Sequence, residues 1–203
     1  MRKANIAVLV SGGGTNLQAL IDAEKAGIIK SGQIALVISN NSSAYAIQRA
    51  KEANIPSTVI TKKQCGNQSD FESKLISELE KSKIDLIVLA GFMSILSENF
   101  TNHFKDRIIN IHPSLIPSFC GQGFYGLKVH EAALERGVKI TGATVHFVNE
   151  IPDGGKIIMQ KAVEVQEDDT PESLQLRVMQ QAEWEILPKA TELVSADILN
   201  AQN

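Results

Sequence analysis

The sequence predicts an α/β protein with a single open sheet, which is mostly parallel and has a late antiparallel extension. Two patterns lead to this prediction. Along the first half of the chain, short and continuously apolar runs alternate with amphipathic stretches of helical period, as expected for parallel strands covered on both faces. Further on, two longer strand patterns flank a Gly-rich turn and favour an antiparallel hairpin at the sheet edge.

Strands and helices alternate up to residue 111. The expected strands are Ile6–Val10, Ile34–Ser39, Leu86–Leu89 and Ile108–Ile111, with a weaker one at Thr58–Ile60. The helices expected between them are Asn16–Ala26, Ala44–Ala53, Asp70–Lys81 and Ser97–Phe104. Strands that alternate with helices imply right-handed crossovers and a Rossmann-like sheet.

The chain changes character after Pro113. A loop rich in Gly and aromatic residues spans Phe119–Gly126, and its composition predicts a mobile segment that becomes ordered with substrate. The elements expected after it are a helix at Leu127–Arg136 and strands at Thr141–Val148 and Lys156–Val165, joined by a turn that contains Pro152-Asp153-Gly154-Gly155.

A last helix is expected from Thr170. The run Thr170-Pro171-Glu172 offers a capping hydroxyl, a proline suited to the first helical position and a carboxylate at the positive end of the dipole. We expect this helix to run toward Val194 with a bend or interruption at Pro188. The sequence thus predicts one domain over residues 1–195 and a frayed tail over residues 196–203.

Composition and charge exclude several classes of protein. The chain has 203 residues, 43% of them hydrophobic, which suffices for one well-buried domain. A net charge of −3 gives no basic field, so we expect neither nucleic-acid nor membrane partners. The first apolar run is too short for a signal peptide, and a cytoplasmic protein is expected. Cys65 and Cys120 form no CxxC pair, so free thiols are expected, with a disulfide as the alternative.

A glycine loop, Ser11-Gly12-Gly13-Gly14-Thr15-Asn16, lies between the first strand and the first helix. Backbone N–H groups there can approach an anion closely, and the helix N-terminus adds positive partial charge. A dinucleotide fingerprint fits poorly because Leu17 replaces its third glycine and no acidic residue follows the second strand. The loop therefore predicts a site for one phosphomonoester, and a tight turn without a ligand is the alternative.

The carboxyl end of a central strand carries Asn110 and His112, which share one face of an extended segment. An amide and an imidazole side by side suit the oxyanion of an acyl transfer, although both could simply end a strand. Asp153 could complete an acid–base pair or be an ordinary turn residue. His146 lies on an expected strand, where it could equally be a core residue whose hydrogen bonds are satisfied within the protein.

The remaining histidines, His103 and His130, fall on expected helices and are predicted to lie at the surface. The four histidines have no spacing typical of a metal site, so we expect no metal.

Four segments, taken in order, resemble the folate-dependent formyltransferases. They are Val10–Gln18, Leu89–Met93, Asn110–Leu115 and Gly142–Val148, the last followed by Asp153-Gly154-Gly155. The glycine loop is similar to that of the family members that formylate glycinamide ribonucleotide. The resemblance implies transfer of the formyl group from the cosubstrate 10-formyltetrahydrofolate to the amine of glycinamide ribonucleotide, in purine biosynthesis, without a metal.

The resemblance also implies roles for individual residues. Asn110, His112 and Asp153 match the catalytic trio of the family, and His146 matches a supporting histidine. The residues that match contacts to the acceptor substrate are Gly13, Gly14, Thr15 and Asn16 at the phosphate and Glu183 at the ribose. The residues that match folate contacts are Met93, Ser94, Ile95, Leu96, Asn110, Asn149, Glu150, Ile151, Pro152 and Gln68.

Three positions depart from the family pattern. Gln68 takes the place of an arginine that reaches the folate's glutamate end, Ser94 that of a frequent arginine, and Trp184 that of a histidine. These changes affect the folate-tail and substrate-loop contacts and leave the catalytic trio intact.

Related activities give the rival interpretations. A formyltetrahydrofolate hydrolase would carry an extra N-terminal domain, and a methionyl-tRNA formyltransferase an extra C-terminal one; neither is expected because the chain starts at the first strand and ends after the last helix. A phosphate-binding module without catalysis is the alternative from another class. We expect a monomer or a homodimer.

Overall fold

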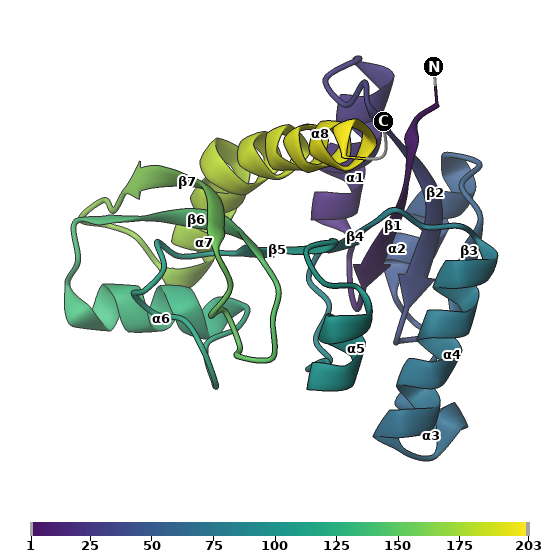
Figure 1. Cartoon of the computed structure of the whole chain (residues 1–203). Coiled ribbons are helices and arrows are strands. Elements are labelled where there is room, and N and C mark those ends of the chain that lie inside the picture. The colour runs from purple at the N-terminus through teal and green to yellow at the C-terminus, as the bar shows by residue number, and fades with distance from the viewer. Residues whose placement is uncertain (1, 202–203) are drawn as a thin grey trace.

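A computed structural model describes residues 2–201, whose strands form one seven-stranded sheet (Figure 1). The strands are β1 (Ala4–Val10), β2 (Gly32–Ser39), β3 (Ser57–Val59), β4 (Leu86–Leu89), β5 (Ile108–His112), β6 (Ile140–Phe147) and β7 (Ile157–Glu164). Their order across the sheet is β3-β2-β1-β4-β5-β6-β7. Strands β1 to β5 pair in parallel, whereas β6 and β7 are antiparallel, so the predicted fold class is confirmed.

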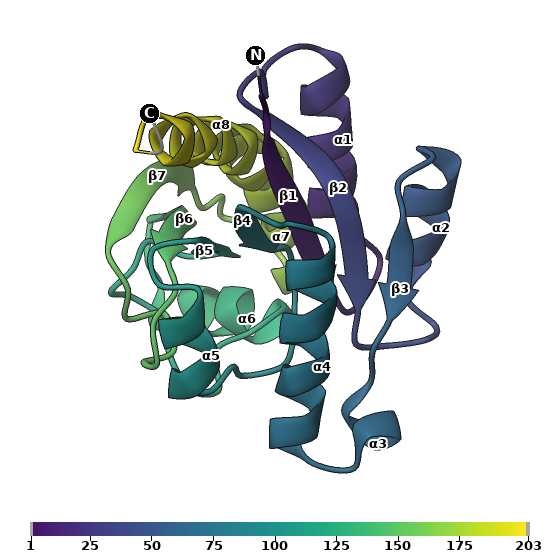
Figure 2. The same cartoon turned by 45° about the vertical axis from the view of Figure 1, so that its right-hand side comes forward.

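Helices cover both faces of this sheet (Figures 1 and 2). They are α1 (Thr15–Lys25), α2 (Tyr45–Glu52), α3 (Lys62–Cys65), α4 (Gln68–Lys81), α5 (Glu98–His103), α6 (Leu127–Arg136), α7 (Pro171–Val178), the π-helix η1 (Met179–Glu183) and α8 (Trp184–Asn200). Apolar residues of α1, α2 and α6 to α8 pack on one face, and those of α4 and α5 on the other. Among the described residues, no helix is both long and apolar enough to cross a bilayer.

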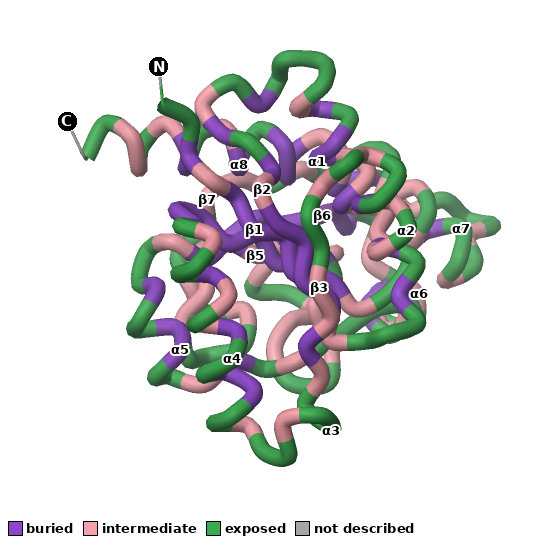
Figure 3. The backbone as a smooth tube through the Cα atoms, turned by 90° about the vertical axis from the view of Figure 1, so that its right-hand side faces the viewer, coloured by how far each residue is buried: buried purple, intermediate pink, exposed green. Residues whose placement is uncertain are grey.

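Burial follows the alternation of side chains along the central strand. In β1, Ile6, Val8 and Val10 face one apolar cluster, while Ala7 and Leu9 face the other. Both clusters are almost fully buried, and Figure 3 shows buried backbone concentrated on the central strands. The strand order reverses between β1 and β4, which places a ligand crevice beyond the carboxyl ends of these two strands.

The C-terminal segment differs from the expectation. Helix α8 continues to Asn200, so a frayed tail over residues 196–203 is wrong as far as residue 200; residues 202 and 203 lie outside the described residues. Ile198 packs against the core, which keeps this stretch helical. The interruption expected at Pro188 falls earlier, at η1. Pro188 itself lies inside α8, and the irregular turn η1 ends at Glu183, directly before the first residue of α8.

Candidate active site

The glycine loop is held against α2. Gly14 has φ 72°, in the left-handed region, and a Cβ there would lie 2.7 Å from the Cβ of Ala46. The amide of Ala46 donates to the Gly12 carbonyl at 3.1 Å. By contrast, a Cβ at Gly12 or Gly13 would meet nothing within 4 Å. The fold therefore requires glycine at position 14, and the open space at the other two lets an anion approach the backbone.

Arg49 is a partner of this loop that the sequence did not reveal. Its Nε donates to the carbonyl of Gly13 at 2.8 Å, and one terminal nitrogen donates to Gln18 at 3.1 Å. The guanidinium also lies over the ring of Tyr45, 5.1 Å from its centroid. A permanent positive charge thus lies beside the N-terminus of α1. A single arginine on a predicted helix carries no signal in the sequence for such a contact.

Asn110 and His146 face each other across the β5–β6 pair. Nδ2 of Asn110 lies 3.2 Å from Nε2 of His146, and Nδ1 of His146 lies 2.8 Å from the Phe147 carbonyl. Because a carbonyl only accepts, Nδ1 carries the proton of the neutral ring and Nε2 accepts from the amide. His146 is only 1% exposed, so it is both a buried, hydrogen-bonded residue and the partner that orients Asn110.

Asp153 brings the late turn to the end of β5. Its Oδ2 lies 3.4 Å from Nδ1 of His112, and its Oδ1 lies 3.5 Å from Nε2 of His146. The amide of Gly121 donates to Oδ2 at 2.8 Å. Asp153 has φ 56°, a left-handed conformation that Asp tolerates in turns. One carboxylate thus lies near both His112 and His146, and Asn110 joins this cluster through His146.

Burial and charge set the protonation of this cluster. Burial lowers the pKa of His112 below its usual value, although Asp153 and the Phe119 carbonyl act to raise it. Burial acts to raise the pKa of Asp153. The proximity of His146 and His112 outweighs this effect, and the hydrogen bond from the Gly121 amide adds to it, so that the pKa of Asp153 falls below its usual value. Near neutral pH the site thus holds an ionised carboxylate beside a largely neutral imidazole.

The loop over residues 119–126 lies against the same cluster. The carbonyl of Phe119 is 2.8 Å from Nε2 of His112, which donates to it. Phe119 has φ 49°, and its ring packs edge-on against Phe124. Cys120 donates to the Pro117 carbonyl at 3.3 Å, and both Cys120 and Cys65 are free thiols, as expected.

One cavity of about 670 Å³ collects most of the predicted site. The predicted residues that line it are Thr15, Asn16, Met93, Ser94, Ile95, Asn110, His112, Pro152, Asp153 and Glu183. The predicted residues outside its wall are Gly13, Gly14, Gln68, Leu96, His146, Asn149, Glu150 and Ile151. The glycine loop, the end of β5 and the turn before β7 thus open into a single space.

The residues outside the wall have identifiable positions. Leu96 is a core residue, 6% exposed. Asn149 and Glu150 line a neighbouring hollow beside α5. Gln68 donates to the Ile95 carbonyl at 3.1 Å, so it contacts the predicted folate-binding segment although it does not line the cavity. Ile151 is exposed at the turn.

Glu183 and Asn16 meet at the far wall of the cavity. Nδ2 of Asn16 donates to Oε2 of Glu183 at 2.6 Å, although 167 residues separate them. Burial raises the pKa of Glu183, and the Asn16 hydrogen bond only partly opposes this. Glu183 closes the π-helix η1, a type of irregularity that is frequent at functional sites.

His130 lines the same cavity, and its predicted surface position is wrong. It is 0% exposed because α6 packs this face against α7. The amphipathic pattern located the helix correctly, but a single histidine in it gave no sign of which face would be covered. His103, in contrast, is exposed as expected.

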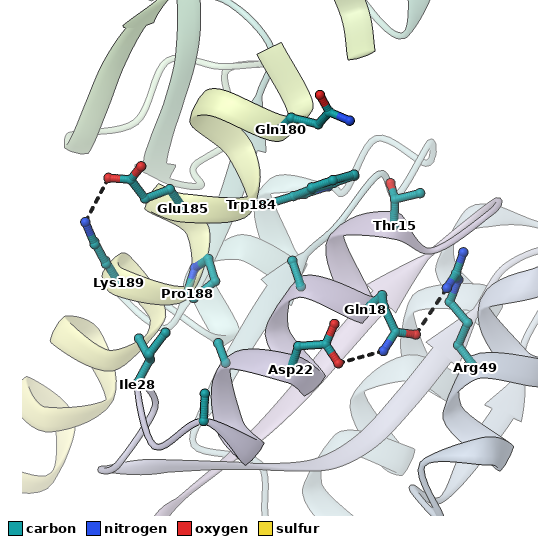
Figure 4. A pocket seen from close by; sticks show the side chains of 13 residues that line it. Thr15, Gln18, Asp22, Ile28, Arg49, Gln180, Trp184, Glu185, Pro188 and Lys189 are labelled. Carbon is teal, nitrogen blue, oxygen red and sulfur yellow. Dashed lines mark hydrogen bonds and ion pairs between the residues drawn. The ribbon is translucent and has the colours of Figure 1, made fainter. Parts of the chain in front are cut away.

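A second cavity of about 550 Å³ lies between α1 and α8 (Figure 4). Trp184 lines this cavity with Pro188 and Lys189. Of the predicted site residues, all of which the structure describes, only Thr15 borders it. Asn110, His112 and Asp153 line only the first of these two cavities, and Thr15 borders both.

Comparison with known proteins identifies the family. Residues 4–191 match the family model described as formyl transferase. The chain belongs to the formyl transferase family. Phosphoribosylglycinamide formyltransferase from Haemophilus influenzae is 44% identical over 183 residues, which cover 90% of this chain and 83% of that protein. The formyl transferase fold recurs in the crystal structure of glycinamide ribonucleotide transformylase 1 from Symbiobacterium toebii, with a TM-score of 0.90, 39% identity, and coverage of 96% and 89%.

Another formyl transferase relative is much longer. The human trifunctional purine biosynthetic protein adenosine-3 is 46% identical over 195 residues, which cover 96% of this chain and 19% of that protein. The chain thus spans about a fifth of the length of the human, chicken and bovine trifunctional proteins that it matches.

Proposed function

We propose that this formyl transferase transfers the formyl group of 10-formyltetrahydrofolate to the amine of glycinamide ribonucleotide, yielding formylglycinamide ribonucleotide and tetrahydrofolate in purine biosynthesis. One observation carries the proposal: a single cavity joins the phosphate loop, at Thr15 and Asn16, to the cluster of Asn110, His112 and Asp153. A substrate that has a phosphate at one end and a reactive amine at the other fits a cavity that these two groups of residues line together. The names of the relatives support the same activity.

The glycine loop is assigned to the phosphate. The N-terminus of α1 and the open backbone at Gly12 and Gly13 favour an anion, and Arg49 adds a full positive charge nearby. Thr15 and Asn16 contribute side-chain donors at the edge of the cavity. Glu183 lies beyond Asn16, in position for a ribose hydroxyl.

The folate is assigned to the other end of the cavity. Met93 and Ile95 expose apolar side chains there, 54% and 69% accessible, which suit the flat ring of a pterin. Ser94 is held by Asn40, whose Nδ2 donates to its hydroxyl at 2.8 Å. Pro152 forms the facing wall beside Asp153. Gln68, which contacts the Ile95 carbonyl, is uncharged and takes the place of the family arginine that reaches the folate's glutamate.

Asn110 is assigned to the oxyanion. The unprotonated amine attacks the formyl carbon, a C–N bond forms, and negative charge develops on the formyl oxygen. One Nδ2 proton of Asn110 is held by His146, and the other stays free to donate to that oxygen. Because the ring of His146 is locked by the Phe147 carbonyl, the amide orientation is set before substrate binds.

His112 and Asp153 are assigned to the proton. His112 enters the reaction with a largely neutral ring near pH 7, since burial lowers its pKa. The developing oxyanion raises that pKa, so the imidazole takes up the proton that the attacking amine loses. Asp153 stabilises the resulting imidazolium across the 3.4 Å separation. When the bond between the formyl carbon and N10 of the folate breaks, the proton lost by the amine reaches N10.

Formyl-folate turnover tests the proposal. The protein is incubated with 10-formyltetrahydrofolate, with and without glycinamide ribonucleotide, and tetrahydrofolate and the formylated product are measured. Product formation only in the presence of the amine is expected. Deformylation at the same rate without amine would assign a hydrolase instead, and binding of the phosphate ligand without any turnover would assign a binding module.

A further inference from the structure

His130 is a buried side chain with two polar ring nitrogens. It is 0% exposed on α6, and neither of its ring nitrogens has a hydrogen-bond partner among the described residues. Leaving a buried donor and acceptor unpaired is costly, so such groups are rare in folded proteins and point to a missing partner.

The missing partner lies on the cavity side. His130 lines the active-site cavity together with Gln175, Met179 and Glu183 from the C-terminal helices. A second such atom lies in the same wall: Oδ1 of Asn16 is buried and has no hydrogen-bond partner in the part of the chain that the structure describes, while its Nδ2 donates to Glu183. Two elements far apart in sequence thus present unsatisfied polar atoms to one space.

We propose that His130 contacts the acceptor substrate between its phosphate and its amine, by hydrogen bonds to a ribose hydroxyl. This inference rests on the proposed function. In the proposed function, the substrate's phosphate lies at the glycine loop near Thr15, and its amine lies near Asn110 and His112. The ribose then lies along the cavity wall between them. The folate segments, Met93–Ile95 and Pro152, belong to the other end.

The chemistry of the ring agrees with a hydroxyl. Burial, with a smaller effect of His112, lowers the pKa of His130 to about 4, so the ring is neutral near pH 7. A neutral imidazole has one N–H donor and one acceptor nitrogen. A hydroxyl donates and accepts in the same way, whereas a phosphate or carboxylate would only accept.

The test measures substrate binding and fold stability in two variants. His130→Phe removes both polar atoms and keeps a planar ring, and His130→Gln keeps a donor and an acceptor. Binding of glycinamide ribonucleotide is followed by calorimetry, and KM is measured for each substrate. For His130→Phe we expect at least about tenfold weaker binding, with KM for 10-formyltetrahydrofolate within about twofold of wild type. His130→Gln should recover part of the loss.

Stability separates a substrate contact from a structural role. Since phenylalanine removes an unpaired polar group, His130→Phe should melt at or above the wild-type temperature while it binds substrate worse. His103→Gln, at an exposed histidine, is the matched control and should change neither quantity.

A substrate analogue identifies the contacted group. Glycinamide ribonucleotide that lacks one ribose hydroxyl should bind wild type more weakly, and His130→Phe should show no further loss for the analogue that lacks the contacted hydroxyl. Wild-type affinity of folded His130→Phe for the full substrate would overturn the contact and leave the proposed function standing. If wild type itself binds no glycinamide ribonucleotide, the proposed function fails, and the contact fails with it.

Discussion

Oδ2 of Asp153 lies 3.4 Å from Nδ1 of His112, while Nε2 of the same ring donates to the Phe119 carbonyl. A ring that bonds a carbonyl through Nε2 is left with Nδ1 as its titrating position. The carboxylate therefore faces the atom that takes up the proton. This relationship makes the charge of Asp153, rather than its shape, the quantity to test.

Asp153→Asn is expected to lower kcat by about 100-fold or more. The amide keeps the size and the turn conformation of the aspartate but removes the opposite charge that favours imidazolium. The pKa of His112, already lowered by burial, should fall further. An NMR titration of His112 in both proteins, combined with steady-state rates, measures the two effects. A folded variant with wild-type turnover and an unchanged titration would reduce Asp153 to a turn residue.

Asn110→Ala is expected to lower kcat by roughly 100- to 1,000-fold, because loss of one oxyanion donor costs about 2.7–4 kcal/mol. Binding of glycinamide ribonucleotide should persist, since the phosphate loop is formed by β1, α1 and α2. Calorimetry and single-turnover rates measure the two quantities separately. Turnover within a few-fold of wild type would remove the amide from the mechanism.

Arg49→Gln is expected to weaken binding of glycinamide ribonucleotide about three- to tenfold, since a partly exposed charge is worth about 1 kcal/mol. Affinity for the dephosphorylated riboside should not change. Wild type should prefer the nucleotide to the riboside and should not bind NAD specifically. Calorimetry with all three ligands decides, and equal loss for nucleotide and riboside would show that Arg49 acts only by holding the Gly13 carbonyl.

The segment Phe119–Gly126 is predicted to be mobile and to become ordered with substrate. The Phe119 carbonyl in this loop accepts the hydrogen bond from Nε2–H of His112. This N–H group can therefore donate to a substrate oxygen only after the loop shifts. Hydrogen exchange of the loop amides, with and without both ligands, should show protection that increases on binding. Strong and unchanged protection in both states would contradict the prediction.

His130→Phe is expected to lose less stability than wild type when the pH is lowered from 7 to 4.5. In wild type the pKa of His130 is about 4, below its usual 6.5. Between these values the unfolded chain binds more protons, so stability falls as the pH is lowered through this range. One pKa unit corresponds to about 1.36 kcal/mol, and the full effect is at most about 3 kcal/mol. Urea titrations of both proteins at pH 7 and pH 4.5 test this, and parallel losses would exclude His130 as the cause.

Local patterns in the sequence predicted the strands of the described sheet and most of the helices in their order, but they did not indicate α3 or the π-helix η1. Leu86–Leu89 and Leu127–Arg136 coincide with β4 and α6 because a continuous apolar run and an amphipathic period are properties of neighbouring residues. The glycine loop was recognisable for the same reason. Asn110 and His112 could be placed on one face of a strand, since side chains alternate along extended backbone.

Contacts between distant segments were decided only by the tertiary structure. Arg49 meets Gly13 because α2 crosses the loop, and Asn16 meets Glu183 across 167 residues. The burial of His130 and the helical state of residues 196–200 depend on packing against α7 and the core, which no local pattern encodes. The pKa values of the cluster depend on burial and on charges brought together by folding. The sequence by itself determined which groups are present and on which elements, and only the folded chain decided which of them meet.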